Sequence, residues 1–357
     1  MKIKKKLLLA PSALILANFL GCFSAAHASP LVSVGDQLDV FFTGTSNLSW
    51  QSNIFADETN ESEDVILTLS PGFQFDFGRG VSNADFSVIT RYDIISYDKN
   101  DAYDTETFHI KALGSYKAAR LEVKGSASFD EQQSALRDTA TIARGTLSEY
   151  DNTAVNLDGE YELSPKFSFG AGAKYMEREF SGPLSSTYAD RETIALPLDL
   201  FYELTPKVDL SIGYQYSNSD ISASRAAYET DSHFLSVGAR GELLPKLTGS
   251  FKVGYRQLDV DNSTTPDEDD SSLGLDANLT WSATPKLTHD ITVARDFGSA
   301  SVGSRVEESS VNLRSSYAIT GQWTGSTSLG YSLREYIGQN RDDAYITAGL
   351  RANYSLN

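Results

Sequence analysis

Charged residues recur at alternate positions within apolar stretches of this chain, in one basic and one acidic group. The basic group comprises Lys174, Arg178, Arg240, Lys252, Arg256, Arg314, Arg334 and Arg351. The acidic group comprises Asp158, Glu160, Glu162, Asp199, Glu203, Asp209 and Glu242. Charged side chains that line a channel can select solutes through the local electrostatic potential. Selectivity in a water-filled lumen is therefore the first chemistry that the sequence suggests.

The acidic and basic groups lie at different positions along the segments that carry them. The acidic residues lie near short turns, and the basic residues lie farther along the same segments. We expect an electropositive zone above an acidic periplasmic mouth, which would favour anionic solutes, including acidic sugars. The alternative is that opposite charges pair across neighbouring strands and only solvate the wall.

Catalytic chemistry has little support in the sequence. Beyond residue 28 the chain has three histidines, His109, His233 and His289, and none lies beside a nucleophile motif. The G-x-S-x-G, P-loop and H-E-x-x-H patterns are absent. The acidic stretch from Asp57 to Asp64 could bind Ca²⁺ or Mg²⁺, but its spacing favours a solvated loop. We predict a protein that is not an enzyme, with no catalytic residue, cofactor or metal.

A repeated Pro-Lys pair indicates how the charged segments are arranged. The pairs begin at Pro165, Pro206, Pro245 and Pro285, at intervals of 41, 39 and 40 residues. Proline cannot donate a ladder hydrogen bond, so each pair is expected in a turn between two strands. The flanking residues alternate between apolar and polar, which is typical of a strand with one apolar face.

Counting the turns predicts the size of the sheet. Weaker short turns are expected at Gly78-Arg79-Gly80, at Tyr116-Lys117-Ala118-Ala119 and at Thr320-Gly321-Gln322. Seven short turns join 14 strands, and one more strand at each end gives 16. The other connections are long and polar, as in residues 261–270. Short turns at one end and long loops at the other predict an all-β, transmembrane, antiparallel up-and-down β-barrel of about 16 strands, formed by residues 29–357.

The first 28 residues are predicted to be a signal peptide. A lysine-rich start is followed by a mostly apolar run and by Ala26-His27-Ala28, a small-x-small cleavage site. A retained membrane helix and lipidation of Cys22, the only cysteine, are the alternatives. Losing the four lysines of this segment changes the formal charge from -18 to -22. Such an acidic chain is a poor candidate for nucleic-acid binding.

Aromatic residues lie near both ends of the predicted strands, as at Tyr202 and Trp281 by the turns and Tyr216 and Tyr255 by the loops. Membrane barrels carry such girdles at the two interfaces. A soluble β-sandwich is the alternative, but it would not need aromatics at both ends of so many strands. The final strand alternates up to Tyr354 and is similar to the assembly signal of outer-membrane barrels, which implies the barrel assembly machinery as a partner.

The first hairpin carries a resemblance to a known family. Its loop entry reads Gln51-Ser52-Asn53-Ile54-Phe55-Ala56-Asp57, then come the acids Glu58, Glu61, Glu63 and Asp64, and then the strand ILTLSPGFQFDFG. This pattern resembles a family of outer-membrane β-barrel porins often met beside exopolysaccharide genes. The resemblance implies an outer-membrane channel or an accessory barrel in polysaccharide secretion, and it implies no catalytic residues.

These observations predict a porin-like channel in a Gram-negative outer membrane that passes anionic saccharides or serves exopolysaccharide export. Outer-membrane lipid, lipopolysaccharide and a polysaccharide or small anionic solute are the expected partners. The alternative is a non-conducting structural or adhesive barrel that uses its acidic extracellular loops. The loop from Ser134 to Asn152 is predicted to be the longest and could fold inward to narrow the pore.

Overall fold

The computed structural model describes residues 16–18, 30–35, 37–55, 60–78, 83–135, 146–182, 185–223, 227–261 and 269–354. The strands are β1 (Leu16–Asn18), β2 (Val32–Val34), β3 (Leu38–Gln51), β4 (Asp64–Phe77), β5 (Ala84–Tyr97), β6 (Thr105–Lys117), β7 (Leu121–Ser134), β8 (Ser148–Ser164), β9 (Phe167–Ser181), β10 (Ala189–Thr205), β11 (Val208–Ala223), β12 (Tyr228–Leu244), β13 (Leu247–Asp261), β14 (Asp270–Thr284), β15 (Leu287–Ser299), β16 (Arg305–Ala318), β17 (Trp323–Tyr336) and β18 (Asp342–Tyr354). Two short 3₁₀ helices, η1 (Asp101–Tyr103) and η3 (Ser185–Thr187), lie in loops. Within the described ranges, no helix is long and apolar enough to cross a membrane.

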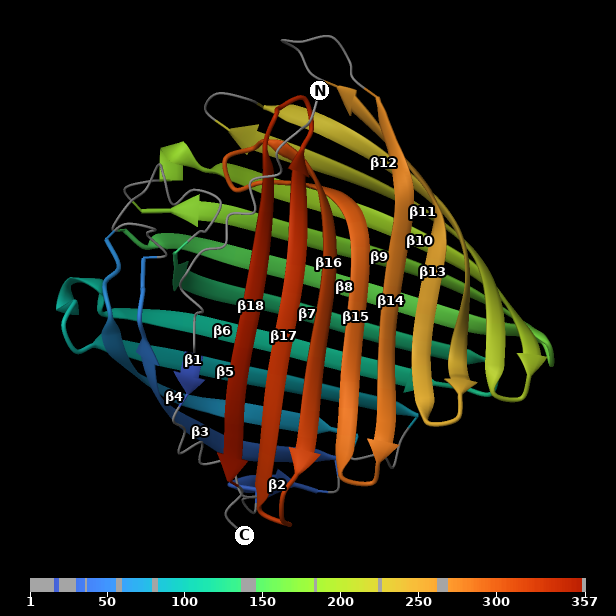
Figure 1. Cartoon of the computed structure of the whole chain (residues 1–357). Helices are drawn as coiled ribbons and strands as arrows, with labels where there is room; N and C mark the ends of the chain where they lie inside the picture. Colours follow the sequence, from blue (N-terminus) through green and yellow to red (C-terminus); the bar gives the residue numbers. More distant parts are fainter. Residues whose placement is uncertain are drawn as a thin grey trace.

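From β3 to β18, every strand pairs antiparallel with its neighbours in sequence. These sixteen strands are 13 to 17 residues long, which exceeds the ~9–11 residues that a tilted strand needs to cross a bilayer. The short β2 pairs with β3 and adds a seventeenth antiparallel strand. The predicted all-β, up-and-down barrel of about 16 strands is confirmed (Figure 1).

The seven predicted short turns all join consecutive strands. Each Pro-Lys pair is a two-residue connection: β8 to β9, β10 to β11, β12 to β13 and β14 to β15. In the third of these turns Lys246 has a φ of 68°, in the left-handed region. The connections after β6 and β16 are also short, whereas Arg79 and Gly80 of the remaining turn lie outside the described residues. We call this the short-turn end and the opposite end the loop end.

The apolar faces of the strands point away from the interior. On β10, Leu196, Leu198 and Leu200 all face outward and stay 42–43% exposed, while Asp199 on the same strand faces the lumen. Because successive side chains alternate between faces, a strand with outward leucines must turn its polar residues inward. Rows of exposed large apolar side chains continue around the sheet, as expected for a lipid-facing surface and not for a soluble sandwich.

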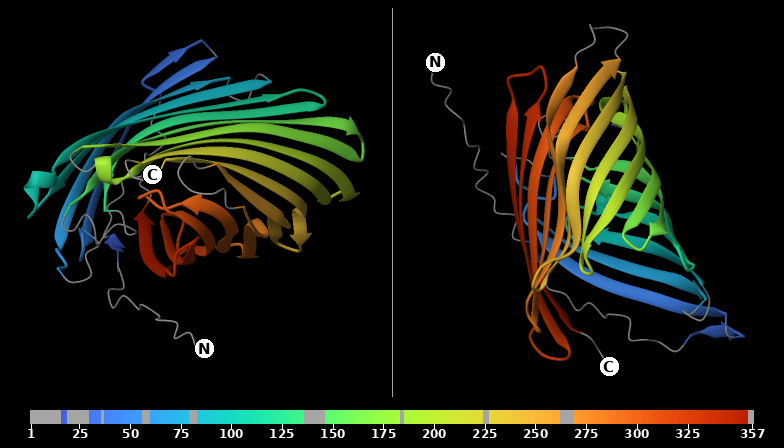
Figure 2. Two further views of the ribbon diagram at one scale, coloured as in Figure 1. Left: turned by 90° about the horizontal axis from the view of Figure 1, so that it is seen from above. Right: turned by 90° about the vertical axis from the view of Figure 1, so that its right-hand side faces the viewer.

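The sheet curls so that β14–β18 face β3–β9 across the interior, as the view from above shows (Figure 2). Strand β1 lies between its two ends, β18 and β3. Strand β1 pairs in parallel with β18, with Ala17 opposite Leu350, and also contacts β3. Among the described residues, no ladder joins β3 directly to β18. Most of the predicted signal peptide, including Cys22, lies outside the described residues.

Candidate functional site

The lumen wall carries all eight residues of the predicted basic group, and the structure shows which charges meet. Arg240 on β12 binds Glu160 on β8 through two hydrogen bonds of 2.7 and 2.6 Å. Its Nε donates to Asp209 on β11 at 3.0 Å, and its guanidinium lies 3.4 Å from the ring centre of Phe201. A Cβ on Gly170 would lie 3.1 Å from that ring, so a residue without a side chain allows Phe201 to lie flat against the wall.

A second ion pair crosses the wall nearby. Lys252 Nζ on β13 donates to both carboxylate oxygens of Asp199 on β10, at 2.6 and 2.7 Å. Strands β11 and β12 lie between the partners, so the side chains must pass over them. A Cβ on Gly213 would lie 2.3 Å from Asp199 Oδ1, and one on Gly238 would lie 3.0 Å from Lys252 Cγ. The bridge therefore depends on two glycines beneath it.

Other basic residues combine an acceptor with an aromatic ring, which favours a guanidinium through both charge and π electrons. Arg334 donates to Glu308 at 2.8 Å and lies 5.5 Å from the ring of Tyr345. Arg178 donates to Asn152 at 2.8 Å and lies 4.9 Å from the ring of Tyr150. Arg256 binds Asp296 at 2.7 Å and lies 4.2 Å from the ring of Phe234.

The other three basic residues are described by their exposure and by the residues opposite them on the neighbouring strands. Lys174 is half-buried opposite Asn156, while Arg314 and Arg351 are exposed opposite Asp290 and Ser326. In the acidic group, Glu242 binds Lys207 beside a turn at 2.5 Å, and Asp158, Glu162 and Glu203 face the lumen near the same end. The structure thus brings part of the two groups together in cross-wall pairs. The anion-selective zone itself stays a prediction.

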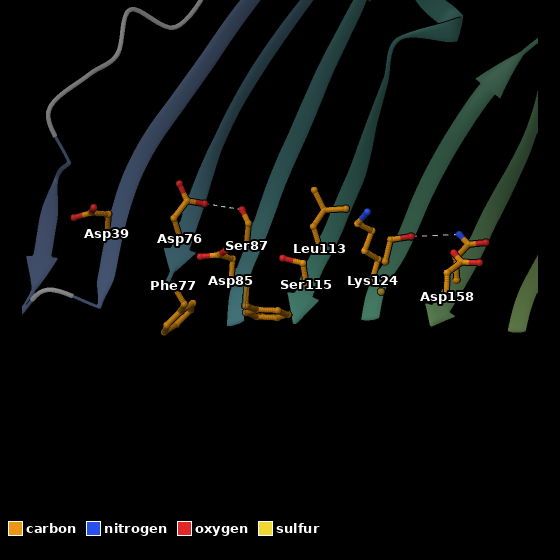
Figure 3. Close-up of a pocket in the computed structure, with 14 residues that line it drawn as sticks. Asp39, Asp76, Phe77, Asp85, Ser87, Leu113, Ser115, Lys124 and Asp158 are labelled. Carbon is orange, nitrogen blue, oxygen red and sulfur yellow. Dashed lines mark hydrogen bonds between the residues drawn. The ribbon is translucent and has the colours of Figure 1, made fainter. Parts of the chain in front are cut away.

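The short-turn end holds an acidic cavity of about 570 Å³ that extends over β3–β8 (Figure 3). Asp39, Asp76, Asp85 and Asp158 line it together with Lys124. Asp39, Asp76 and Asp85 are not part of the predicted acidic group, although each shares the inward alternation and lies near a short turn. Among the described residues, no group of three or more His, Cys, Asp and Glu side chains could hold a metal ion.

A connection folds inward at the loop end. The backbone N–H of Ala189, at the start of β10, donates to the carbonyl of Ser301 between β15 and β16, at 2.8 Å. Four strands separate β10 from β15 in the sheet, so this bond joins opposite sides of the lumen. Ala300 is buried against Val306 and Tyr336. The connection over residues 300–304 thus narrows the lumen. This constriction was not predicted from the sequence, because the segment is short and carries no special motif.

The loop that was expected to fold inward is shorter than predicted. Strand β7 continues to Ser134 and β8 begins at Ser148, so that the connection spans only residues 135–147. Residues 136–145 lie outside the described residues. Within the first hairpin, the motif residue Ile54 is 4% exposed and packs on Ile66 and Tyr97. This part of the family-like motif fills the loop end with apolar side chains.

A cavity of about 450 Å³ lies between the two walls at the loop end. From one wall it is lined by Tyr150 and Arg178, and from the other by Arg334 and Tyr345. Glu308, which pairs with Arg334, also lines the cavity. The rest of the lining is mostly small and polar, with serines, Asn312 and Thr347. This combination offers cationic groups, aromatic rings and hydrogen-bonding groups to a solute inside the lumen.

The three histidines have structural partners. His109 contacts Asp130 at 2.8 Å through Nδ1, and its Nε2 lies 3.1 Å from Thr107 Oγ1 and 3.3 Å from Asp93. Thr107 is 5% exposed, so a solute cannot easily reach its hydroxyl. His233 stacks on Tyr214. His289 stacks on Trp281 and lies 2.7 Å from Ser315.

Comparisons with known proteins agree with this architecture. Residues 231–357 match the family model described as "Putative beta-barrel porin 2", which supports the resemblance to a β-barrel porin family. The matched segment runs from within β12 to the chain end, not over the first hairpin that carried the resemblance. A search of the curated proteins found no match.

Two solved structures share the fold. One is the ferric citrate transporter FecA in its unliganded form, with a TM-score of 0.50, 11% identity, and coverage of 90% of this chain and 56% of that chain. The other is the FrpB iron transporter from Neisseria meningitidis, with a TM-score of 0.51, 11% identity, and coverage of 91% and 60%. The chain thus spans less than two thirds of either protein. At this identity the likeness establishes the outer-membrane β-barrel fold alone.

Proposed function

We propose that the barrel is a channel in a Gram-negative outer membrane that passes anionic saccharides or serves the export of an acidic exopolysaccharide. The porin-family match supports a barrel channel. The outward apolar rows and the inward polar faces support a membrane position with a water-accessible lumen.

The observation that carries the saccharide proposal is the cavity of about 450 Å³ at the loop end. Arg178 and Arg334 enter it from opposite walls, each beside a tyrosine ring. Guanidinium groups bind carboxylates through charge-assisted hydrogen bonds. Tyrosine rings offer apolar faces with a polar edge, which suits the mixed surface of a sugar. Hydroxyl and amide side chains can bond to the sugar hydroxyls.

Single-channel recordings of the refolded protein in a planar bilayer, with a salt gradient, test the proposal. We expect steady steps and a reversal potential that indicates anion preference. The double variant Arg178→Gln/Arg334→Gln should reduce that preference. A matched control is Arg341→Gln, since Arg341 binds Asp343 at the loop end and does not line the cavity. An unchanged reversal potential in the double variant would count against the saccharide route.

A second candidate function is a non-conducting structural or adhesive barrel. The bond between Ala189 and Ser301 across the lumen favours it, since the β15–β16 connection narrows the loop end. A barrel that shows the heat-modifiable gel shift of a folded protein but conducts no current would place this function first.

We also propose that residues 1–28 are removed during secretion, that the barrel assembly machinery inserts the chain, and that lipopolysaccharide surrounds its loops. We infer a non-enzymatic protein. The mass of the protein purified from outer membranes tests the first point: a chain that begins at Ser29 is expected, and a lipidated Cys22 would give a different mass.

A further inference from the structure

We propose that a second lumen cavity, of about 360 Å³ over β8–β16, is a binding site for one carboxylated sugar unit. This inference rests on the proposed saccharide channel and locates its specific binding step. The cavity lies within the size range of ligand sites, ~300–1,000 Å³. It is lined by inward residues of β10–β13, and it reaches Asp296 and Gly298 on β15.

Three buried polar atoms in this cavity lack partners. They are Tyr228 Oη, Ser232 Oγ and Arg256 Nε, and none has a hydrogen-bond partner among the described residues. Their residues are only 8%, 8% and 4% exposed. A buried polar group without a partner destabilises the empty site, because it has lost its bonds to water and gained none in return. A ligand that supplies acceptors and donors at these three atoms would remove that destabilisation, which is the physical basis for binding here.

The charge of the cavity favours an anion. Its lining contains five basic residues, Lys174, Arg191, Lys252, Arg256 and Arg305, against four acidic ones, Asp158, Asp199, Asp276 and Asp296, a formal net charge of +1. Two of the carboxylates already bind Lys252 and Arg256. Arg191 Nε donates to Thr193 Oγ1 at 3.1 Å, and within the described residues its guanidinium pairs with no carboxylate. A ligand carboxylate would therefore find Arg191 available.

Hydroxyl and guanidinium groups share the lining of this cavity. Arg191, Arg305 and Tyr228 all contribute to it. Thr193 and Ser219 share a hydrogen bond of 2.9 Å within the same lining. A carboxylate beside Arg191 would thus have hydroxyl groups around it, at positions where the neighbouring ring hydroxyls of a sugar can bond. This arrangement distinguishes a carboxylated sugar from a simple inorganic anion.

The backbone keeps the site open and pre-shaped. A Cβ on Gly274 would lie 2.5 Å from the ring of Phe234 and 3.2 Å from Arg256 Nε, so glycine makes room for both. On the opposite wall, a Cβ on Gly298 would lie 3.8 Å from Arg191 Nη1. Arg191 therefore spans the lumen toward β15, and a ligand in the cavity would contact both walls. Rigid walls reduce the ordering cost of binding.

Isothermal titration of the folded mature protein in detergent tests the site, with trigalacturonate as the acidic probe and maltotriose as the neutral one. We expect trigalacturonate to bind at least tenfold more tightly than maltotriose. Arg191→Gln should weaken trigalacturonate binding about tenfold, and Tyr228→Phe and Ser232→Ala about fivefold each. The last two changes remove one unpaired hydroxyl apiece and should leave the heat-modifiable gel shift intact. Tyr255→Phe, on the outward face, is the matched control and should bind normally.

Equal binding of the two probes, no binding of trigalacturonate, or unchanged affinity in the three variants would overturn the proposal. Titration in detergent does not depend on conduction, so the two proposals can fail separately. Tight acidic binding by a silent barrel would leave the site standing and remove the channel. Anion-selective conduction with unchanged affinity for trigalacturonate in the variants would support the channel and rule out the binding site.

Discussion

Arg240 and Glu160 are joined by two hydrogen bonds although 80 residues and three strands separate them. Together with the Lys252–Asp199 pair, this contact fastens side chains from β8 to β13 along one inner wall. The Lys252–Asp199 pair passes over Gly213 and Gly238, and Phe201, which lies against Arg240, passes over Gly170, so the wall is shaped to let long side chains cross it.

Glu160→Gln should lower the free energy of unfolding by about 1–2 kcal/mol, because it removes the charge from two charged hydrogen bonds. The two side chains are 32% and 34% exposed, so solvent screening reduces the loss below that of a fully buried pair. Urea unfolding in lipid vesicles, followed by tryptophan fluorescence, measures the change. Lys207→Gln, which breaks a more exposed pair with Glu242, is the control and should cost less than about 1 kcal/mol.

Gly213→Ala should destabilise the barrel by about 1–3 kcal/mol, since the new methyl group would overlap Asp199 Oδ1 and displace the bridge to Lys252. Gly321→Ala is the matched control, because a Cβ at that position has no atom within 4 Å. The same urea titration compares the two variants. Equal stabilities would mean that the glycine beneath the ion pair is not needed.

Arg314→Glu should shift the reversal potential toward cation preference. Arg314 is exposed on the lumen wall opposite Asp290, so its reversal changes the local potential without breaking a buried pair. A combined charge reversal of Arg240, Arg256, Arg314 and Arg334 should have a larger effect. If selectivity survives both changes, the basic group only solvates the wall.

Deleting residues 301–303 should increase single-channel conductance, because the connection between β15 and β16 would no longer reach Ala189 across the lumen. Deleting residues 136–145 provides the comparison, since these residues belong to the loop from Ser134 to Asn152 that was predicted to be able to fold inward. An increase in conductance only after deletion of residues 136–145 would support a constriction by the loop between β7 and β8. An increase in conductance only after deletion of residues 301–303 would assign the constriction to the β15–β16 connection.

The candidate site was predictable only where a local rule applied. Alternation places Arg240, Lys252 and Arg256 on the inner face, and it places Asp39, Asp76 and Asp85 of the first hairpins there as well. It could not have found the binding cavity, because Tyr228 and Ser232 are ordinary strand residues until opposite walls enclose them. Alternation also does not predict the hydrogen bond from Ala189 to Ser301, because this bond joins two backbone groups and alternation concerns side chains.

The sequence by itself determined the strands, their turns and the face on which each side chain lies. These features are local: side chains alternate with a period of two, and Pro-Lys at Pro165, Pro206, Pro245 and Pro285 forces a turn between adjacent segments. Only the tertiary structure decided which charges meet and where the lumen narrows. Those contacts depend on the tilt and curvature of the whole sheet, which bring Glu160 to Arg240 and Ser301 to Ala189 across strands that no local pattern relates.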